Sequence, residues 1–311
     1  MRLAVYLPLV LPLTALPVAR LATDHLHPRT ATRLLTGVAA VLAACSTLSL
    51  ALLMVVGTAQ VPGNPLPDGW ADPEVRDEVP HVRVFGTAAI VGLLAVLAAV
   101  AVVVCRVVRV RRGARRAVAG LPARGGVAVL PDAEPYAFAL PGARPCVVVS
   151  TGMLACLDSR ERRALIAHER AHLAGAHHRV LLTARLAAAG QPLLRPLCTA
   201  IAYTVERWAD EEAASAIGDR RTTAQAVGKA ALAARRPGPA GLPAFAAPSP
   251  GSVPRRVAAL LGPTPDTAWP TPRSRTGLAA IVAAAGTTVS VVSALNATAA
   301  LFVILKAATA L

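Results

Sequence analysis

Charged and aromatic residues are scarce in this sequence. Of 311 residues, 16% are charged and only 3% are aromatic, whereas 55% are hydrophobic. A soluble globular domain usually has about a quarter of its residues charged, and a disordered chain needs low hydrophobicity. The composition therefore argues against both classes and predicts a membrane protein.

Lysine is also nearly absent, because Lys229 and Lys306 are the only lysines among 32 basic residues. Abundant Ala, Arg, Gly and Pro indicate a GC-rich coding sequence, so the net charge of +15 does not by itself imply a functional demand. The five cysteines form no C-x-x-C pair and lie partly inside apolar runs, so no disulfide framework is implied. We expect them to be buried, reduced thiols.

Long apolar runs cover residues 34–57, 84–105 and 277–305. A helix needs roughly 20 apolar residues to cross a bilayer, so each run predicts a span. A weaker run, 3–19, contains three prolines and is either a kinked span or a signal sequence. Because no A-x-A-like cleavage site followed by a soluble domain is present, we interpret it as an uncleaved span.

The arginines predict the orientation. Six of them closely follow the third span, whereas the loop 58–83 contains only Arg76 and Arg83. The positive-inside rule then places the segment after the third span in the cytoplasm and the N-terminus outside. A nucleic-acid surface is the weaker interpretation, because this cluster adjoins a span and has no interleaved aromatics to stack on bases.

The spans divide the chain into residues 1–33, with the first span and a cytoplasmic loop; 34–116, with the next two spans; 117–276; and 277–311, with the fourth span. We expect the third part to be a cytoplasmic domain, because its length suffices for a core of its own.

The start of that domain is rich in β-prone residues. Runs 126–130, 136–140 and 146–150 are separated by Pro-Asp, Pro-Gly and Arg-Pro turn signals, which predicts a three-stranded sheet. A helical pattern follows from Ser159 to Ala176, and Asp158 and Glu161 are spaced as a capping box.

Two later stretches are less definite. Residues 180–205 are apolar but broken by Arg, Gln and Pro, which is typical of either a helix pair inside the domain or a re-entrant segment touching the membrane. Residues 235–276 are rich in Pro, Gly and Ala and suggest a partly flexible connection to the last span.

The predicted helix carries His168-Glu169-Arg170-Ala171-His172. Residues four apart lie on one helical face, so both imidazoles can bind one ion while Glu169 lies beside it. This H-E-x-x-H pattern predicts a Zn²⁺ site with His168 and His172 as ligands. Glu169 is the expected general base and acid, which takes a proton from water and passes it to the leaving amine.

The third ligand has several candidates. Glu206 lies on a later helical pattern and shares a face with Asp210, as in gluzincin sites, where an aspartate orients a zinc-bound imidazole. We favour this pair over the neighbouring Glu211 and Glu212, which have no carboxylate four residues on. His178 would complete the metzincin pattern H-E-x-x-H-x-x-G-x-x-H, but no methionine follows it for the required turn. The Glu206 interpretation makes His177 and His178 surface residues.

The segment from Val127 to Ala214 resembles the catalytic domain of integral-membrane gluzincins. The resemblance rests on three runs, VAVLPD, YAFALPG and VVVSTGML, followed by the zinc helix and by Glu206 to Asp210. Such enzymes include the HtpX and CAAX-prenyl-protease type and the BlaR/MecR-type antirepressor peptidases. The resemblance implies that residues 137–140 form the edge strand that binds an extended substrate. It also implies that Arg256 steadies the oxyanion; otherwise Arg256 is an ordinary charged helix position.

The order of three spans, a peptidase and a fourth span resembles the BlaR/MecR type, which cleaves a cytoplasmic repressor in response to an outside signal. The given sequence stops just after the fourth span, so β-lactam sensing is not carried over. The expected fold is a multi-pass α-helical membrane protein with a cytoplasmic α+β zincin-like domain. The expected partners are the lipid bilayer and a protein substrate, a DNA-binding repressor. Alternatives are an HtpX-like quality-control protease and a non-catalytic receptor or scaffold.

Overall fold

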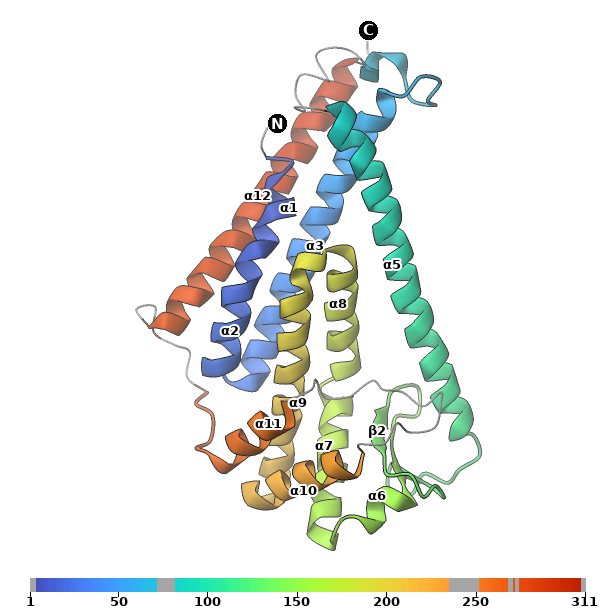
Figure 1. Ribbon diagram of the computed structural model, residues 1–311, viewed down its shortest axis with the longest axis vertical. Helices are drawn as coiled ribbons and strands as arrows, with labels where there is room; N and C mark the ends of the chain where they lie inside the picture. Colours follow the sequence, from blue (N-terminus) through green and yellow to red (C-terminus); the bar gives the residue numbers. More distant parts are fainter. Residues whose placement is uncertain (1–3, 72–81, 235–251, 268–270, 272–273, 309–311) are drawn as a thin grey trace.

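The structure is a computed structural model that describes residues 4–71, 82–234, 252–267, 271 and 274–308. The membrane-type helices splay apart from one end of the molecule, and the sheet with its helices lies at the other end (Figure 1). The helices are α1 (Leu7–Val10), η1 (Leu11–Thr14), α2 (Ala15–His25), α3 (Pro28–Ala59), η2 (Asp68–Ala71), α5 (Val82–Ala117), α6 (Thr151–Ala155), α7 (Ser159–Ala174), α8 (His177–Gly190), η3 (Pro192–Leu194), α9 (Arg195–Ile217), α10 (Arg220–Ala233), α11 (Ser252–Leu261) and α12 (Arg275–Ala308).

Four helical segments are long and apolar enough to cross a membrane: Leu7–His25, Pro28–Ala59, Val84–Ala117 and Ala280–Ala307. Helices therefore cover the described residues of all four predicted apolar runs from Leu7 on. The N-terminal segment is irregular, because prolines at the starts of α1 and η1 divide it into short pieces. These four segments support association with a membrane.

The predicted sheet is confirmed in number and position of strands. Its strands are β1 (Val127–Leu130), β2 (Ala137–Leu140) and β3 (Cys146–Ser150), in the order β1-β3-β2. β1 pairs with β3 in parallel, and β2 pairs with β3 antiparallel. The central strand β3 is buried along its whole length, as its run of valines predicts. β2 therefore lies at an edge of the sheet.

Helix α7 begins at the predicted capping box. The Asp158 carboxylate accepts hydrogen bonds from the backbone N–H groups of Arg160 and Glu161, and Glu161 accepts one from the backbone N–H of Asp158. Glu161 is buried, and its other oxygen lies 2.5 Å from Nζ of Lys229 on α10. These contacts fix the start of the helix that carries the H-E-x-x-H motif.

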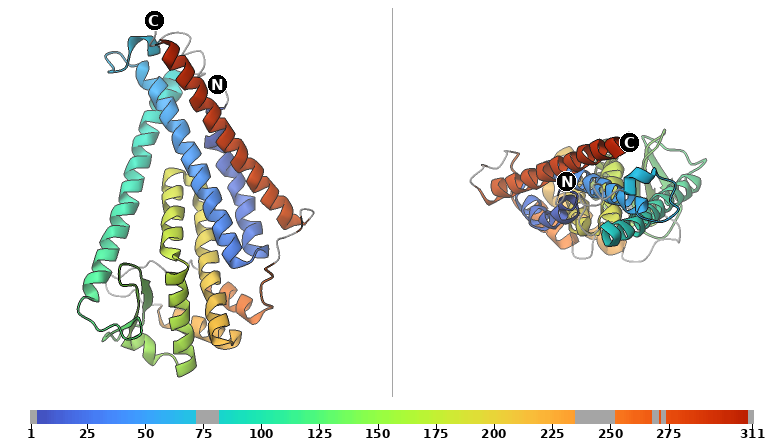
Figure 2. Two further views of the ribbon diagram at one scale, coloured as in Figure 1. Left: turned by 180° about the vertical axis from the view of Figure 1, so that it is seen from behind. Right: turned by 90° about the horizontal axis from the view of Figure 1, so that it is seen from above.

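The stretch 180–205 forms most of a helical hairpin that rises among the candidate spans. α8 runs up between α5 and α3, and α9 returns beside it (Figures 1 and 2). At the tip, Nε2 of Gln191 donates to the Leu9 carbonyl at 3.3 Å and to Oγ of Ser46 at 3.2 Å. Ser46 lies near the middle of the predicted span 34–57, so the hairpin reaches about halfway along α3.

The hairpin and the spans share one hydrophobic core. Its largest fully buried side chains include Leu35 and Leu42 from α3 and Leu194, Leu197 and Ile201 from η3 and α9. Thr32 on α3 also donates to Oγ1 of Thr204 on α9 at 2.9 Å. Helix α9 is thus packed directly against a candidate span.

Two other expectations have mixed outcomes. All five cysteines are free, as predicted, but Cys105 and Cys156 are exposed, so the expectation that all five are buried is wrong. Within the predicted flexible connection, 252–261 form helix α11, whereas 235–251, 268–270 and 272–273 lie outside the described residues. Arg76, counted in the orientation argument, lies outside them too.

Candidate metal centre and active site

Three side chains converge on one point between α7 and α9. Nε2 of His168 and Nε2 of His172 are 3.1 Å apart. The Glu206 carboxylate lies 3.6 Å from Nε2 of His168 and 3.5 Å from Nε2 of His172. One ligand atom from each residue lies within 4.8 Å of the others, and all three residues are buried.

Local sequence explains this convergence. His168 and His172 are one turn apart on α7, so they share the face that packs on α9. Glu206 lies on a part of α9 in which every residue is buried, from Thr204 to Asp210. The third candidate ligand therefore comes from a helix that is distant in sequence and adjacent in space.

The outward nitrogen of His168 faces a second carboxylate. Nδ1 of His168 lies 3.1 Å from Oδ1 of Asp210, one turn after Glu206. Burial opposes a charge on Asp210, but Arg256 and His168 outweigh it and hold the pKa of Asp210 below its usual value. Burial likewise opposes a charge on His168, and Asp210 and Glu206 overcome this and raise its pKa to about 10. Asp210 therefore faces Nδ1, and Nε2 of the same imidazole is directed at the cluster.

Arg256 reaches the site from α11 and is 5% exposed. Its Nη1 lies 2.9 Å from Oε2 of Glu206, and its Nη2 lies 2.6 Å from Oδ1 of Asp210. The guanidinium thus bridges the two carboxylates. The structure places it in the candidate site, where it already holds two side chains of the protein.

Glu169 lies beside the cluster and is buried. The backbone N–H of Ala139 on β2 favours the charged form of the Glu169 carboxylate. Burial is the main reason that the pKa of Glu169 rises to about 7, and the charge of Glu206 adds to the rise. A carboxylate with a pKa near neutrality can both accept and return a proton at physiological pH.

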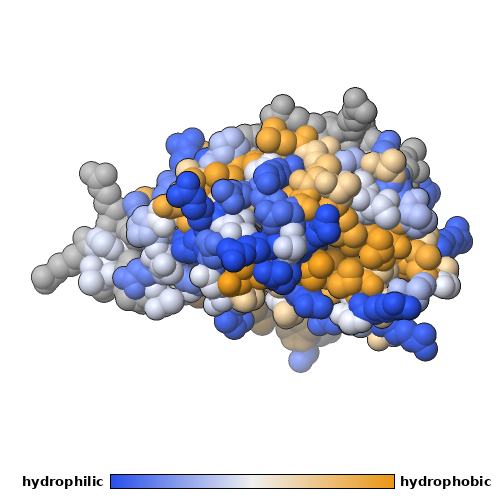
Figure 3. Space-filling model, turned by 90° about the horizontal axis from the view of Figure 1, so that it is seen from below, coloured by the Kyte–Doolittle hydropathy of each residue, from blue (hydrophilic) through white to orange (hydrophobic). Residues whose placement is uncertain are grey.

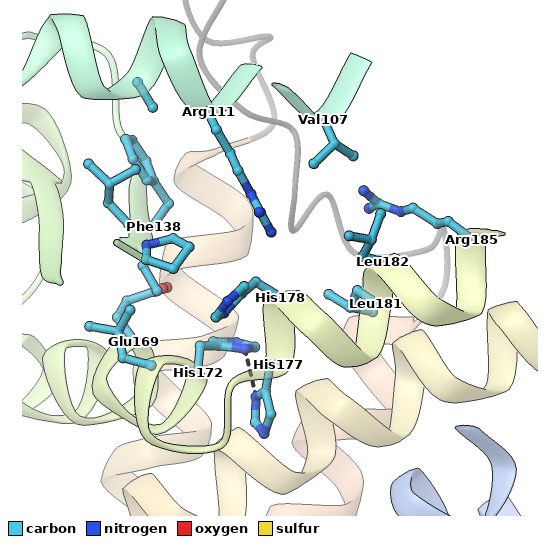
Figure 4. A pocket seen from close by; sticks show the side chains of 15 residues that line it. Val107, Arg111, Phe138, Glu169, His172, His177, His178, Leu181, Leu182 and Arg185 are labelled. Carbon is cyan, nitrogen blue, oxygen red and sulfur yellow. Dashed lines mark hydrogen bonds between the residues drawn. The ribbon is translucent and has the colours of Figure 1, made fainter. Parts of the chain in front are cut away.

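The prediction that His177 is a surface residue is wrong. The side chain is 1% exposed, and its Nδ1 lies 2.9 Å from Nδ1 of His172 (Figure 4). The spacing to His172, with Gly175 between them, was the available signal, because a turn there can bring the chain back to the metal helix. His178 is only partly buried and lines the cleft described below.

The other candidate ligands lie elsewhere. Glu211 forms ion pairs with Arg207 and Arg220, and Glu212 accepts a hydrogen bond from Nε1 of Trp208 at 2.9 Å. Among the residues that the structure describes, the one group of histidine, cysteine or acidic side chains close enough to hold a metal is His168, His172 and Glu206.

A mostly apolar cleft opens beside the cluster, between α5, β2 and α8. Glu169 and His172 lie at its inner end, and Val107, Leu181 and Leu182 line its walls (Figure 4). Residues 138–141 of β2 and the following turn form one side. Seen from the end that carries the sheet, apolar surface covers much of the half toward α5, with polar side chains beside it (Figure 3).

Residues 106–193 match Peptidase family M48, whereas no curated protein and no solved structure matches the chain. The matched segment includes the end of α5, the sheet, α6, α7 and the whole of α8. It therefore contains His168, Glu169 and His172 but not Glu206, Asp210 or Arg256. The match supports a metallopeptidase of the zincin type.

The donor set suits a zinc ion. Two imidazole nitrogens and one carboxylate are the ligands of catalytic zinc sites that leave a fourth position open. Burial lowers the pKa of His172 to about 4, so this imidazole is neutral and can donate a lone pair, whereas His168, with a pKa of about 10, must release a proton to bind an ion. The second nitrogen of each imidazole has a neighbour of its own, which leaves both Nε2 atoms directed at the common point.

Proposed function

We propose that this protein is a zinc metalloendopeptidase of the membrane, with its active site on the cytoplasmic side. The observation that carries the proposal is the convergence of two Nε2 atoms and the Glu206 carboxylate next to the buried Glu169. The cytoplasmic orientation is supported by the arginines that follow the third apolar run.

His168, His172 and Glu206 would hold the ion. Its Lewis acidity would lower the pKa of a water molecule and polarise the scissile carbonyl. Glu169 accepts a proton from the attacking water and then donates it to the leaving amine. Asp210 and Arg256 hold His168 and Glu206 in place, and Arg256 is also our candidate for steadying the oxyanion.

The edge strand β2 is suited to bind the substrate. It pairs with β3 on one side, and residues 138–141 line the cleft that contains Glu169. An extended polypeptide placed along this edge would gain backbone hydrogen bonds with little demand on sequence. This supports an endopeptidase that selects extended, accessible polypeptide segments whose apolar side chains fit the cleft.

We propose a cytoplasmic transcriptional repressor as the substrate. The support is the order of elements: three candidate spans, the sheet with its peptidase helices, and a fourth candidate span. This order resembles the antirepressor peptidases. A gene for a small winged-helix repressor beside the gene for this chain would favour this substrate.

A second candidate is quality control of membrane proteins. The observation that favours it is the position of the cleft between α5 and α8, two helices whose upper parts lie at the level of the spans. At the hairpin tip, a Cβ on Gly190 would lie 3.8 Å from the Val96 side chain of α5. A segment leaving the bilayer could enter this cleft directly.

The test compares new protein N-termini in host cells that express the wild type or Glu169→Gln. A wild-type-only cut in a soluble DNA-binding protein is the result expected for the repressor proposal. Cuts confined to membrane proteins would support quality control instead. Purified wild type that contains zinc but cleaves no unfolded test protein would contradict the peptidase proposal and support a scaffold.

A further inference from the structure

The two nitrogens of His172 have different neighbours. Nε2 faces His168 at 3.1 Å and Glu206 at 3.5 Å, on the side of the candidate metal position. Nδ1 lies on the opposite side of the ring, 2.9 Å from Nδ1 of His177, and the dashed line in Figure 4 marks this contact. His172 therefore has the partner for its second nitrogen in another imidazole, whereas His168 has a carboxylate.

A tight reversal of the chain produces this contact. α7 ends at Ala174, α8 begins at His177, and Ala176 between them has φ 48°. Ala176 is the one non-glycine residue with positive φ in the described part of the chain. Because this conformation is unfavourable for L-residues, it persists only where surrounding contacts impose it. The reversal places His177 against the preceding helix.

The His177 ring is held on two further sides. Its centroid lies 4.5 Å from that of Trp208, which is two residues after Glu206 on α9. A Cβ built on Gly175 would lie only 2.3 Å from Nε2 of His177, so the imidazole occupies the space that a side chain would need. Arg29 and Arg33 of α3 cover the Trp208 ring, at 5.5 and 5.6 Å from its centroid. His177 is thus held between α7, which carries the two candidate histidine ligands, and α9, which packs against the candidate span α3.

The donor and acceptor roles of the ring nitrogens determine the tautomers of His172 and His177. If Nε2 of His172 binds a metal, its Nδ1 carries the proton and can only donate. The acceptor is Nδ1 of His177, so the proton of His177 must be on Nε2. That Nε2 is buried and has no hydrogen-bond partner among the described residues. A phenyl ring would fill the same space without burying this N–H, so the imidazole is explained by its acceptor on the other side.

We propose that His177 is a positioning residue of the metal site: its Nδ1 accepts the Nδ1–H of His172 and so fixes the tautomer and ring orientation of that ligand. This inference rests on the proposed zinc function. It predicts that the residue acts on metal affinity through His172.

The test measures zinc affinity by chelator competition on the full-length chain in detergent micelles. His177→Phe keeps the ring but removes the acceptor and should weaken zinc binding by about 10–100-fold. His177→Asn places Oδ1 where Nδ1 was and should restore most of the affinity. His25→Phe, at an exposed histidine of α2, is the matched control and should bind zinc as the wild type does.

Equal zinc affinity of His177→Phe and wild type would overturn the proposal, as would an Asn variant no better than Phe. If the Phe variant fails to fold, ¹⁵N-histidine NMR of the zinc-loaded wild type decides: a proton on Nε2 of His177 supports the proposal, and one on Nδ1 overturns it. A wild type that binds no zinc would overturn the proposed function together with this inference, whereas zinc binding unaffected by His177→Phe would overturn only the inference.

Discussion

Arg256 and Asp210 form a two-pronged ion pair in the protein interior. Nε of Arg256 donates to Oδ2 at 2.8 Å and Nη2 donates to Oδ1 at 2.6 Å, and the two residues are 46 positions apart. This fork joins α11 to the helix that carries Glu206. Planar two-point recognition of a carboxylate is a property of arginine that lysine cannot reproduce.

Arg256→Met should destabilise the protein by about 3–5 kcal/mol, because it leaves two buried carboxylates without their cation. Zinc affinity should fall as well, since Glu206 and Asp210 lose the group that holds them. Arg256→Lys should recover part of the stability. Chemical denaturation in detergent and chelator competition measure the two effects. If zinc binding and stability stay unchanged while kcat falls, Arg256 serves the oxyanion alone.

Glu169→Gln and His168→Ala should separate catalysis from metal binding. The amide cannot accept a proton, so Glu169→Gln should retain zinc and lose cleavage by at least about 10²-fold, the lower range for a positioned general base. His168→Ala removes a ligand and should lose both. Zinc content by elemental analysis and cleavage of an unfolded test protein are the measurements. Full activity in the Glu169→Gln protein would contradict the assignment.

Gly57 on α3 and Gly86 on α5 mark the close crossing of these helices. A Cβ on Gly86 would lie 2.4 Å from the Cα atom of Gly57, and backbone cannot move aside as a side chain can. Gly86→Ala should therefore force the helices apart and destabilise the protein by about 1–3 kcal/mol.

The control for Gly86→Ala is Gly37→Ala on the partner helix α3, where nothing lies within 4 Å of the added Cβ. This variant should be neutral or slightly stabilising, because alanine is the better helix former. Thermal unfolding in detergent compares the two variants. Equal melting temperatures would contradict the close crossing.

Gln191→Leu should loosen the tip of the α8–α9 hairpin. The change removes the hydrogen bonds to the Leu9 carbonyl and to Ser46, in a region where water is scarce if the spans are in a bilayer. Hydrogen bonds between membrane helices contribute about 0.6–2 kcal/mol, and we expect a loss of that size in the free energy of unfolding. Gln225→Leu, at an exposed position of α10, is the control and should change it little.

The capping box gives a pH prediction. Backbone N–H donors from Glu161 and Arg160, with nearby Lys229, hold the pKa of Asp158 below its usual value. A depressed folded-state pKa stabilises the protein above the unfolded-state pKa of about 3.9, and the contribution disappears as pH falls through the folded value. The stability difference between wild type and Asp158→Ala should thus be present at neutral pH and shrink below about pH 4. If the stability difference between the two proteins, measured by equilibrium unfolding, does not change with pH, the helix-capping role of the ionised Asp158 is contradicted.

Much of the fold followed from short-range patterns in the sequence. Apolar runs long enough to span a bilayer, β-prone runs between turn signals, and Asp158 with Glu161 all act within a few residues. The helix period alone brings His168 and His172 to one face. Such features need no knowledge of distant contacts, and the strands and α7 have the predicted positions within one or two residues.

Contacts between distant segments were decided by tertiary structure. Sequence left open whether 180–205 packs within the domain or reaches the spans, because its apolar composition suits both; the packing of Gln191 against Ser46 places it among the spans. Sequence placed His177 on the surface, because a histidine after a helix usually meets solvent. The ring of His177 reaches His172 only because the chain reverses direction at Ala176 and Trp208 packs against the ring. Arg256 likewise reaches Asp210 only because α11 packs on α9, a contact that no local periodicity specifies.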